Sequence, residues 1–308
     1  MSESWEPIAG SAPATPHTLL PLFPTFLTNR RHGFAGIATS LSRPALLLLR
    51  DVAMRPAGGA TAESLRPGAP YSTRDPHLPW LAEAIQTGFL RQDATGRYHL
   101  SERGLATVTR LEREAAAYLA ALQPLPGATL ARLAEELAAI AAGLDADYSG
   151  LDSHLARTRR LAALAPAANA APLVQIDRAI LDLWLARDDA HIAAWRYARF
   201  PGPVLDILTH LWRGDASTLA ELRAGLAATQ APDDVDAGVD ELIEQGYVEW
   251  RRDILQPTRA GYAVREHIEA DTDAHYFSQW PDLADARLAW LHETLRQLIT
   301  ALPDAPPR

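Results

Sequence analysis

One pattern occurs twice in this chain, and it constrains the fold more than any other feature. Segments 82–104 (AEAIQTG, FLRQDATGRYHL, SERG) and 240–261 (DELIEQG, YVEWRRDILQP, TRAG) share Glu, Ile and Gly at one offset, 158 between Gly88 and Gly246. Two matches lie upstream, where PALLLLR parallels PVLDILT and AESLR parallels AELR. Because self-similarity at a fixed separation indicates a repeated structural unit, the sequence predicts two copies of one module.

Each copy has the residue order of a helix, a two-stranded hairpin and a capped helix. In the later copy, an amphipathic segment ends at Gly246, since glycine readily adopts the left-handed conformation found at helix ends. Extended apolar residues then flank the polar tip Arg251–Asp253, and Thr258 is a residue type that caps a helix. We therefore expect a mainly α-helical protein with tandem winged-helix domains, each a helix-turn-helix plus a two-stranded wing, joined by a helical connector.

Prolines and glycines divide the chain further. We expect an N-terminal arm over 1–36, the first winged helix with its trailing helix over 37–123, a connector over 124–200, the second winged helix over 201–280, and a C-terminal helix and tail over 281–308. The last connector helix is predicted to start after Pro172 and to break near Asp188 and Asp189, where Asp189 would cap a further helix. The terminal helix carries a leucine stripe that either packs on its own domain or forms a homodimer: Leu288, Leu291, Leu295 and Leu298.

Composition excludes several kinds of protein. The 308 residues are 48% hydrophobic, enough for a substantial core, and contain no cysteine, which excludes disulfides, thiol catalysis and cysteine-bound metals. No segment is apolar and long enough to cross a membrane. The absence of cysteine agrees with the cytoplasmic location that we expect. The formal charge is −9, and every basic residue is arginine. An acidic balance weighs against a protein that binds nucleic acid mainly through phosphates.

The two copies differ in their suitability for DNA. A winged helix reads the major groove with its third helix and touches phosphates with its wing. The candidate contacts in the first copy are Arg74, His77, Gln86, Arg91 and Arg97. The third helix of the second copy and its approach contain no arginine and six carboxylates: Asp233, Asp234, Asp236, Asp240, Glu241 and Glu244. Because carboxylates repel phosphates, the second copy is predicted to be a poor DNA reader.

One stretch is similar to a known family. The run Thr258-x-x-Gly261-x-x-x-Arg265-Glu266-x-Ile268-Glu269-x-x-Thr272-Asp273, with Arg187-Asp188-Asp189-Ala190-His191 upstream, resembles an uncharacterised family of bacterial helical proteins ending in a MarR-like winged helix. The resemblance covers about residues 180–280. Resemblance to MarR-type regulators implies a dimeric, ligand-responsive DNA-binding protein. We therefore expect a non-catalytic, transcription-regulator-like binding protein.

A candidate metal site lies in the same run. His267, Asp271 and His275 recur at every fourth position, which places them on one stripe of a helix, and His191 is a candidate ligand from another helix. Imidazole and carboxylate groups suit zinc or another divalent ion. The alternative is an ordinary solvated helix face, and we expect no other cofactor.

Two further candidate sites involve the connector. Gln175-Ile176-Asp177 resembles the Gln-x-Asp motif of winged-helix DNA glycosylases, which implies Asp177 as base and Gln175 as the residue that orients a water. The alternative is the polar face of a connector helix. Aromatic residues near the connector's end are candidates for a pocket holding a small apolar effector, or else are core: Trp184, Trp195, Tyr197 and Phe200. No serine–histidine–acid order, phosphate loop or metalloprotease motif is present.

Overall fold

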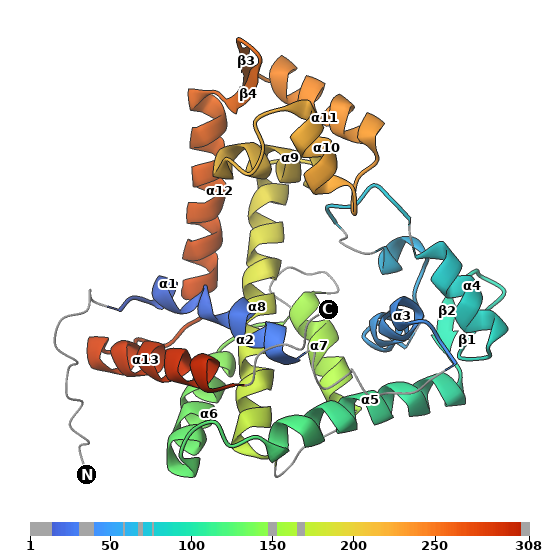
Figure 1. Cartoon of the computed structure of the whole chain (residues 1–308), viewed down its shortest axis with the longest axis vertical. Helices are drawn as coiled ribbons and strands as arrows, with labels where there is room; N and C mark the ends of the chain where they lie inside the picture. The colour runs from blue at the N-terminus through green and yellow to red at the C-terminus, as the bar shows by residue number, and fades with distance from the viewer. Residues whose placement is uncertain are drawn as a thin grey trace. The chain divides into compact units, whose positions relative to one another are not determined.

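A computed structural model describes residues 14–30, 40–57, 59–66, 70–75, 77–146, 153–164 and 170–302 (Figure 1). The chain is mainly α-helical, as predicted, and forms two compact units. Unit 1 comprises Met1–Thr39, Leu105–Asp189 and Tyr276–Arg308, and unit 2 comprises Ser40–Gly104 and Ala190–His275. The five consecutive segments expected from the sequence are therefore grouped differently, and the predicted connector is divided after Asp189. Within the described residues, no helix is long and apolar enough to cross a membrane.

Unit 1 is built from helices alone in its described part. They are α1 (Pro16–Leu19), α2 (Leu22–Arg30), α6 (Gly127–Ala141), α7 (His154–Ala163), α13 (Asp285–Ala301) and parts of α5 (Glu102–Ala121), α8 (Pro172–Tyr197) and α12 (Arg259–Phe277). The leucine stripe of α13 is buried, and α13 contacts α1 and α2 of the predicted arm, where Leu19, Phe23 and Phe26 are buried. The stripe therefore packs within its own chain, and its leucines are not exposed for a second copy.

The predicted break in the last connector helix is wrong, because α8 runs without interruption from Pro172 to Tyr197. Asp189 is 9% exposed and accepts hydrogen bonds from the backbone N–H groups of His154 (2.7 Å) and Leu155 (3.0 Å). These are the first residues of α7, whose N–H groups lack partners within the helix. Asp189 therefore caps a neighbouring helix and does not start a new one.

We expect Asp189→Ala to lower the free energy of unfolding by ~2 kcal/mol, because two N–H groups at the start of α7 lose their acceptor. Urea unfolding followed by circular dichroism measures the change. Asp189→Asn keeps one acceptor oxygen and should recover part of the loss. Gln175→Ala is the control, since Gln175 is exposed on the same helix, and equal effects of the two alanine variants would contradict the capping role.

Unit 2 contains two segments with corresponding elements, which we call the first module (residues 40–104) and the second module (residues 190–275). The first module holds α3 (Arg43–Ala53), the 3-10 turn η2 (Glu63–Leu65), α4 (Leu78–Gln86), β1 (Leu90–Gln92) and β2 (Tyr98–Leu100). The second holds α9 (Gly202–Arg213), α10 (Leu219–Leu226), α11 (Pro232–Glu244), β3 (Val248–Arg251) and β4 (Ile254–Pro257). Both strand pairs are antiparallel, with Leu90 opposite Leu100 and Val248 opposite Pro257.

The turn from the third helix into the hairpin is built alike in the two modules. Gly88 and Gly246 follow the helix with φ angles of 75° and 73°, the left-handed region that glycine enters without strain. The next residue bonds back into the helix: Phe89 N–H donates to Ala84 O at 2.8 Å, and Tyr247 N–H to Leu242 O at 2.9 Å. The glycines identified in the sequence therefore occupy equivalent positions.

The start of the following helix is also built alike. The hydroxyl oxygen of Ser101 accepts from Gly104 N–H at 3.0 Å, and that of Thr258 accepts from Gly261 N–H at 3.1 Å. A Cβ atom on Gly104 would lie 2.2 Å from Phe89 O, and one on Gly261 would lie 2.0 Å from Tyr247 O. Each helix therefore approaches the hairpin so closely that only glycine fits. The modules differ upstream, where η2 of the first corresponds to the longer α10 of the second.

Candidate nucleic-acid interface

The outer face of α4 carries no charge. Leu78 is 49% exposed and Ile85 is 36% exposed, and Ala82 and Gln86 are also at the surface. The single carboxylate of this helix, Glu83, accepts hydrogen bonds from the hydroxyl and the backbone N–H of Ser42, both at 2.6 Å. The bond from the Ser42 hydroxyl has the largest effect and the bond from its backbone N–H the next, and both lower the pKa of Glu83. The helix thus presents apolar and amide groups outward, while its one negative charge is held against the start of α3.

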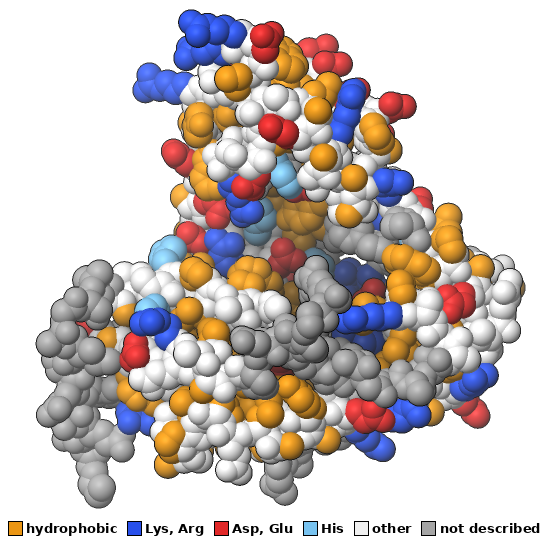
Figure 2. All heavy atoms as spheres, in the orientation of Figure 1, with side chains coloured by type: hydrophobic (Ala, Val, Ile, Leu, Met, Phe, Trp, Pro, Cys, Tyr) orange, Lys and Arg blue, Asp and Glu red, His pale blue; other side chains and the backbone are white. Residues whose placement is uncertain are grey.

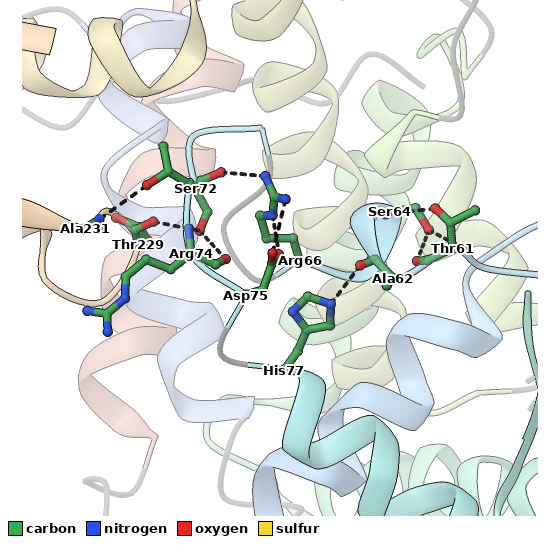
Figure 3. Close-up of polar contacts among 11 residues, drawn as sticks. Thr61, Ala62, Ser64, Arg66, Ser72, Arg74, Asp75, His77, Thr229 and Ala231 are labelled. Atoms are coloured by element: carbon green, nitrogen blue, oxygen red, sulfur yellow. Dashed lines mark hydrogen bonds and ion pairs between the residues drawn. The ribbon is translucent and has the colours of Figure 1, made fainter. Parts of the chain in front are cut away.

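Two of the predicted DNA contacts are used inside unit 2. His77 is fully buried, and its Nε2 lies 2.7 Å from Ala62 O (Figure 3). It fastens the start of α4 to the residue before η2, so the prediction that it contacts DNA is wrong. Arg74 lies at the surface, but its guanidinium donates to Ala227 O at 2.6 Å and its backbone N–H donates to Thr229 O at 3.1 Å. Its side chain is therefore committed to the second module.

The other three predicted contacts remain at the surface of the first module. Gln86 ends α4, Arg91 lies on β1, and Arg97 precedes β2 and donates to Gly59 O at 3.1 Å. The carboxylate at the hairpin tip, Asp93, is engaged by the Thr95 hydroxyl and the His99 ring. The hydrogen bond from the Thr95 hydroxyl has the largest effect and the one with the His99 ring the next, and together they hold the pKa of Asp93 well below its usual range. The hairpin therefore exposes two arginines beside a carboxylate that is already hydrogen-bonded.

The two modules differ in charge. Residues 40–104 contain eight arginines and six acidic residues, a net charge of +2, whereas residues 190–275 contain eight arginines and fifteen acidic residues, a net charge of −7. Four of the carboxylates on α11 are exposed, and Asp236 pairs with Arg223 at 2.8 Å. Figure 2 shows basic side chains at the β3–β4 end of the second module and both acidic and basic side chains over α10 and α11. The second module thus combines an acidic third helix with exposed Arg251 and Arg252 on its hairpin.

The modules are tied together by a segment before α4. The backbone oxygen of Thr229 accepts from Thr73 N–H at 2.9 Å and from the Ser72 hydroxyl at 2.8 Å (Figure 3). Trp195 Nε1 also donates to the hydroxyl of Tyr71 at 3.1 Å. Thr229 belongs to the turn between α10 and α11, so part of the first module lies on the turn of the second. Sequence reasoning missed this contact, because polar loop residues 157 positions apart carry no pattern that relates them.

The model of a helix-turn-helix family matches residues 106–306, which is more than half of the chain. The chain belongs to this helix-turn-helix family. The matched range includes α10, α11 and the turn between them, whereas the first module lies outside it. The prediction of a helix-turn-helix is thereby confirmed, and the finer assignment to MarR-like proteins stays a prediction. No curated protein and no solved structure matches the chain significantly.

The metal-site residues of this helix-turn-helix protein do not converge. The side chain of His267 is 68% exposed and lies 3.4 Å from its neighbour Asp271, while His191 Nδ1 lies 3.1 Å from Thr272 Oγ1 and 3.8 Å from Glu269. His275 is exposed. Nowhere in the described residues do three or more metal-binding side chains meet at one point. His267, Asp271 and His275 lie on one helix, α12, as predicted. His191, the ligand expected from another helix, contacts Thr272 and Glu269 of α12 and does not join them.

The two residues of the glycosylase-like motif lie on different sides of α8. Gln175 is exposed, and its amide donates to Ala170 O at 2.7 Å. Asp177 is only 3% exposed. Residues two positions apart on a helix do not face each other, so the pair does not hold a common water in this arrangement.

The four aromatic candidates differ in burial and fall in both units. Trp195 and Phe200 are 4% and 7% exposed and belong to the core of the second module, whereas Tyr197 is 86% exposed. Trp184 belongs to unit 1. The predicted effector pocket stays a prediction.

A cavity that the sequence did not reveal lies in unit 1, walled by α5, α7 and α8. Its volume is about 170 Å³, and Asp177 is the one residue of its lining that had been singled out from the sequence. The other charged members, Glu112, Arg159, Arg178 and Asp182, come from three helices. Their spacing in each helix is that of an ordinary amphipathic face, so no motif could have identified them.

Proposed function

We propose that this helix-turn-helix protein is a DNA-binding regulator that carries two winged helices and contacts DNA chiefly through the first module. The observation that carries the proposal is the surface of α4 and its hairpin. It offers Gln86, Arg91 and Arg97 and no unengaged carboxylate on the helix. We also propose that the protein acts in the cytoplasm.

The assignment of two winged helices is supported by the equivalent local geometry of the modules. In both, a left-handed glycine ends the third helix, a two-stranded antiparallel hairpin follows, and a hydroxyl residue caps the next helix beside a second glycine. The family match supports a helix-turn-helix in the second module. We extend this fold to the first module because those local features recur there at the same positions.

Electrostatics favours the first module as the DNA-binding one. Each arginine beside a phosphate releases counterions, and each carboxylate there is repelled. The net charge of the first module is +2 and that of the second is −7. The exposed carboxylates Asp233, Asp234, Asp240 and Glu244 lie on α11, the helix that would have to enter the groove. In the first module the corresponding helix is uncharged on its exposed face.

The exposed side chains of α4 suit the edges of A·T base pairs in the major groove. Apolar side chains contact the methyl group of thymine, and a glutamine amide bonds to adenine. Leu78, Ala82 and Ile85 are apolar and exposed on α4, and Gln86 ends the helix. Arg91 and Arg97 would contact the phosphates beside the groove. We therefore infer a preference for A·T-rich sites over G·C-rich ones.

A salt titration of DNA binding tests this proposal. Binding of the full chain to a random-sequence duplex, measured by fluorescence anisotropy between ~50 and ~200 mM salt, should weaken steeply as salt rises. Arg91→Ala combined with Arg97→Ala should lower the affinity about tenfold and reduce the salt slope by ~2, about one for each lost phosphate contact.

The matched control replaces the two exposed arginines of the other hairpin, Arg251 and Arg252, with alanine. This variant should keep the affinity and the slope. An equal loss in both double variants would place the contact in the second module or show only diffuse attraction, and either result contradicts the proposal. The absence of binding at the lowest salt would refute DNA binding altogether.

A further inference from the structure

Residues 70–75, which we call the entry segment, lead into α4 and lie against the second module. The backbone N–H groups of Thr73 and Arg74 both donate to Thr229 O, at 2.9 and 3.1 Å. The hydroxyl oxygen of Thr73 accepts from the backbone N–H of Ala231 at 3.3 Å. Thr229 and Ala231 lie in the turn just before α11. The entry segment is therefore hydrogen-bonded to the helix-turn-helix of the second module.

The beginning of the entry segment packs on the same module. The ring centroids of Tyr71 and Trp195 are 5.8 Å apart, and the Tyr71 hydroxyl accepts the indole N–H of Trp195, which belongs to the core of the second module. A Cβ atom on Gly202 would lie 2.5 Å from Pro70 O. The backbone of the entry segment therefore approaches the start of α9 so closely that only glycine fits there.

The entry segment is also bonded to the first module. Arg66 donates from Nη1 to Ser72 O at 3.2 Å and from Nε to Asp75 Oδ1 at 2.6 Å (Figure 3). The ring of His77 lies 2.7 Å from Ala62 O, and α4 begins at the next residue. The same short stretch of chain is thus held by the second module on one side and by the first on the other.

These contacts fix the start of α4 relative to the second module. A connection without such partners samples many backbone conformations, and ordering it during binding costs conformational entropy. A binding element that is already fixed does not incur this cost when it binds. The exposed face of α4 must also meet the base edges at a defined angle, because misaligned hydrogen bonds are weak.

We propose that the second module is the scaffold that positions α4 for DNA binding. Ser72, Thr73, Trp195 and Gly202 act as positioning residues, which hold the reading helix without touching DNA. This role rests on the proposed function of the first module. It gives a use to a second module whose acidic third helix is repelled by phosphates.

Gly202→Ala tests the role from within the second module. The added Cβ meets a backbone oxygen of the entry segment, so this segment has to move away from α9. We expect the affinity for duplex DNA to fall about fivefold, since α4 is no longer held in advance. The salt slope should stay unchanged, because no phosphate contact is lost. Fluorescence anisotropy at several salt concentrations measures both quantities.

The matched control is Gly225→Ala on α10 of the same module. Its added Cβ would lie 3.6 Å from the His210 ring, which is an ordinary contact, so this variant should bind DNA like the parent. A Gly202→Ala variant that also binds like the parent would overturn the positioning role. A loss accompanied by a smaller salt slope would overturn it too, because it would indicate a direct phosphate contact.

A second variant alters the entry segment itself without changing its charge. Ser72→Ala combined with Thr73→Val removes the hydroxyls that bond to Thr229 O and to the N–H of Ala231. It should also lower the affinity about fivefold at an unchanged slope. Thr73→Ser keeps its hydroxyl and should retain the parent affinity. Equal losses in the double variant and in Thr73→Ser would contradict the role of these bonds.

Amide hydrogen exchange gives a readout that needs no DNA. The amides of Thr73 and Arg74 should exchange slowly in the parent, and at least about tenfold faster in Gly202→Ala, with an unchanged circular dichroism spectrum. Faster exchange with unchanged DNA affinity would refute the positioning role and leave the proposed DNA contact intact. A parent chain that binds no DNA at ~50 mM salt would refute the proposed function and this role together.

Discussion

Gly261→Ala is expected to lower the free energy of unfolding by ~3 kcal/mol, since overpacking at a site that cannot yield costs about this much. The added Cβ would lie 2.0 Å from the backbone oxygen of Tyr247. That oxygen cannot rotate away as a side chain would, because it also accepts the N–H of Thr258 at 2.9 Å. Either α12 separates from the hairpin or this bond is lost. Thermal unfolding should show a midpoint lower by roughly 6–12 °C.

Gly104→Ala should have a similar effect. Its Cβ would lie 2.2 Å from Phe89 O, which accepts the N–H of Ser101 at 3.0 Å. The control is Gly127→Ala at the start of α6, where nothing lies within 4 Å of the added atom. That variant should stay within about 0.5 kcal/mol of the parent. If Gly261→Ala behaved like Gly127→Ala, the close approach of helix and hairpin described above would be wrong.

Arg265→Ala is expected to lower the free energy of unfolding by ~3 kcal/mol, because it removes the residue that joins a set of buried polar contacts. The Arg265 side chain is 2% exposed, its Nε donates to Thr209 Oγ1 at 2.9 Å, and its Nη1 lies 2.5 Å from Glu269 Oε1. The guanidinium also lies 4.9 Å from the centre of the Trp212 ring. Alanine leaves Glu269 without this partner and separates α12 from α9. Urea unfolding at neutral pH measures the loss.

Arg265→Lys separates charge from geometry. Lysine keeps the positive charge but lacks the planar fork that contacts hydroxyl, carboxylate and ring together, so we expect a loss of about half that of alanine. Arg259→Ala, an exposed position in the first turn of the same helix, is the control and should change stability little. A fully stable Arg265→Ala variant would show that packing alone joins the two helices.

The features predicted correctly from the sequence are those determined by neighbouring residues. The turn glycines, the hydroxyl residue that caps the following helix and the hairpin between them lie within about twenty positions of one another. Their backbone preferences act locally, so the residues of each copy determine its turn, hairpin and helix start without the rest of the chain. The amphipathic face of α11 was likewise predicted from its own periodicity, and Leu242 is buried as expected.

The features that were missed depend on partners distant in the chain. Asp189 is a residue type that caps helices, and it does cap one, but that helix, α7, begins 35 residues earlier in the chain. His77 looks like a surface residue because it precedes an amphipathic helix. Its ring is buried instead, and the contact with Ala62 O offsets the cost of removing it from water. Single-sequence patterns do not show which acceptor will lie opposite a polar side chain.

The candidate site was predicted in part for the same reason. Gln86, Arg91 and Arg97 are exposed as expected, since hairpin and helix-end residues face solvent wherever the module sits. Arg74 differs because the turn of the second module offers it a carbonyl. The cavity of unit 1 was not predicted, since three helices meet there and none of them contains a distinctive motif.

The assembly of each unit from separated segments has a consequence for biosynthesis. Ser72 bonds to Thr229, which the ribosome adds 157 residues later. At ~5–20 residues per second, the first module waits roughly 8–30 s for this partner. Unit 1 waits longer still, because α13, whose leucines cover the arm, begins 255 residues after α2 ends (285 − 30). The newly made chain therefore exposes the apolar side chains of its arm until α13 has been made, and that interval is when a chaperone has the most to bind.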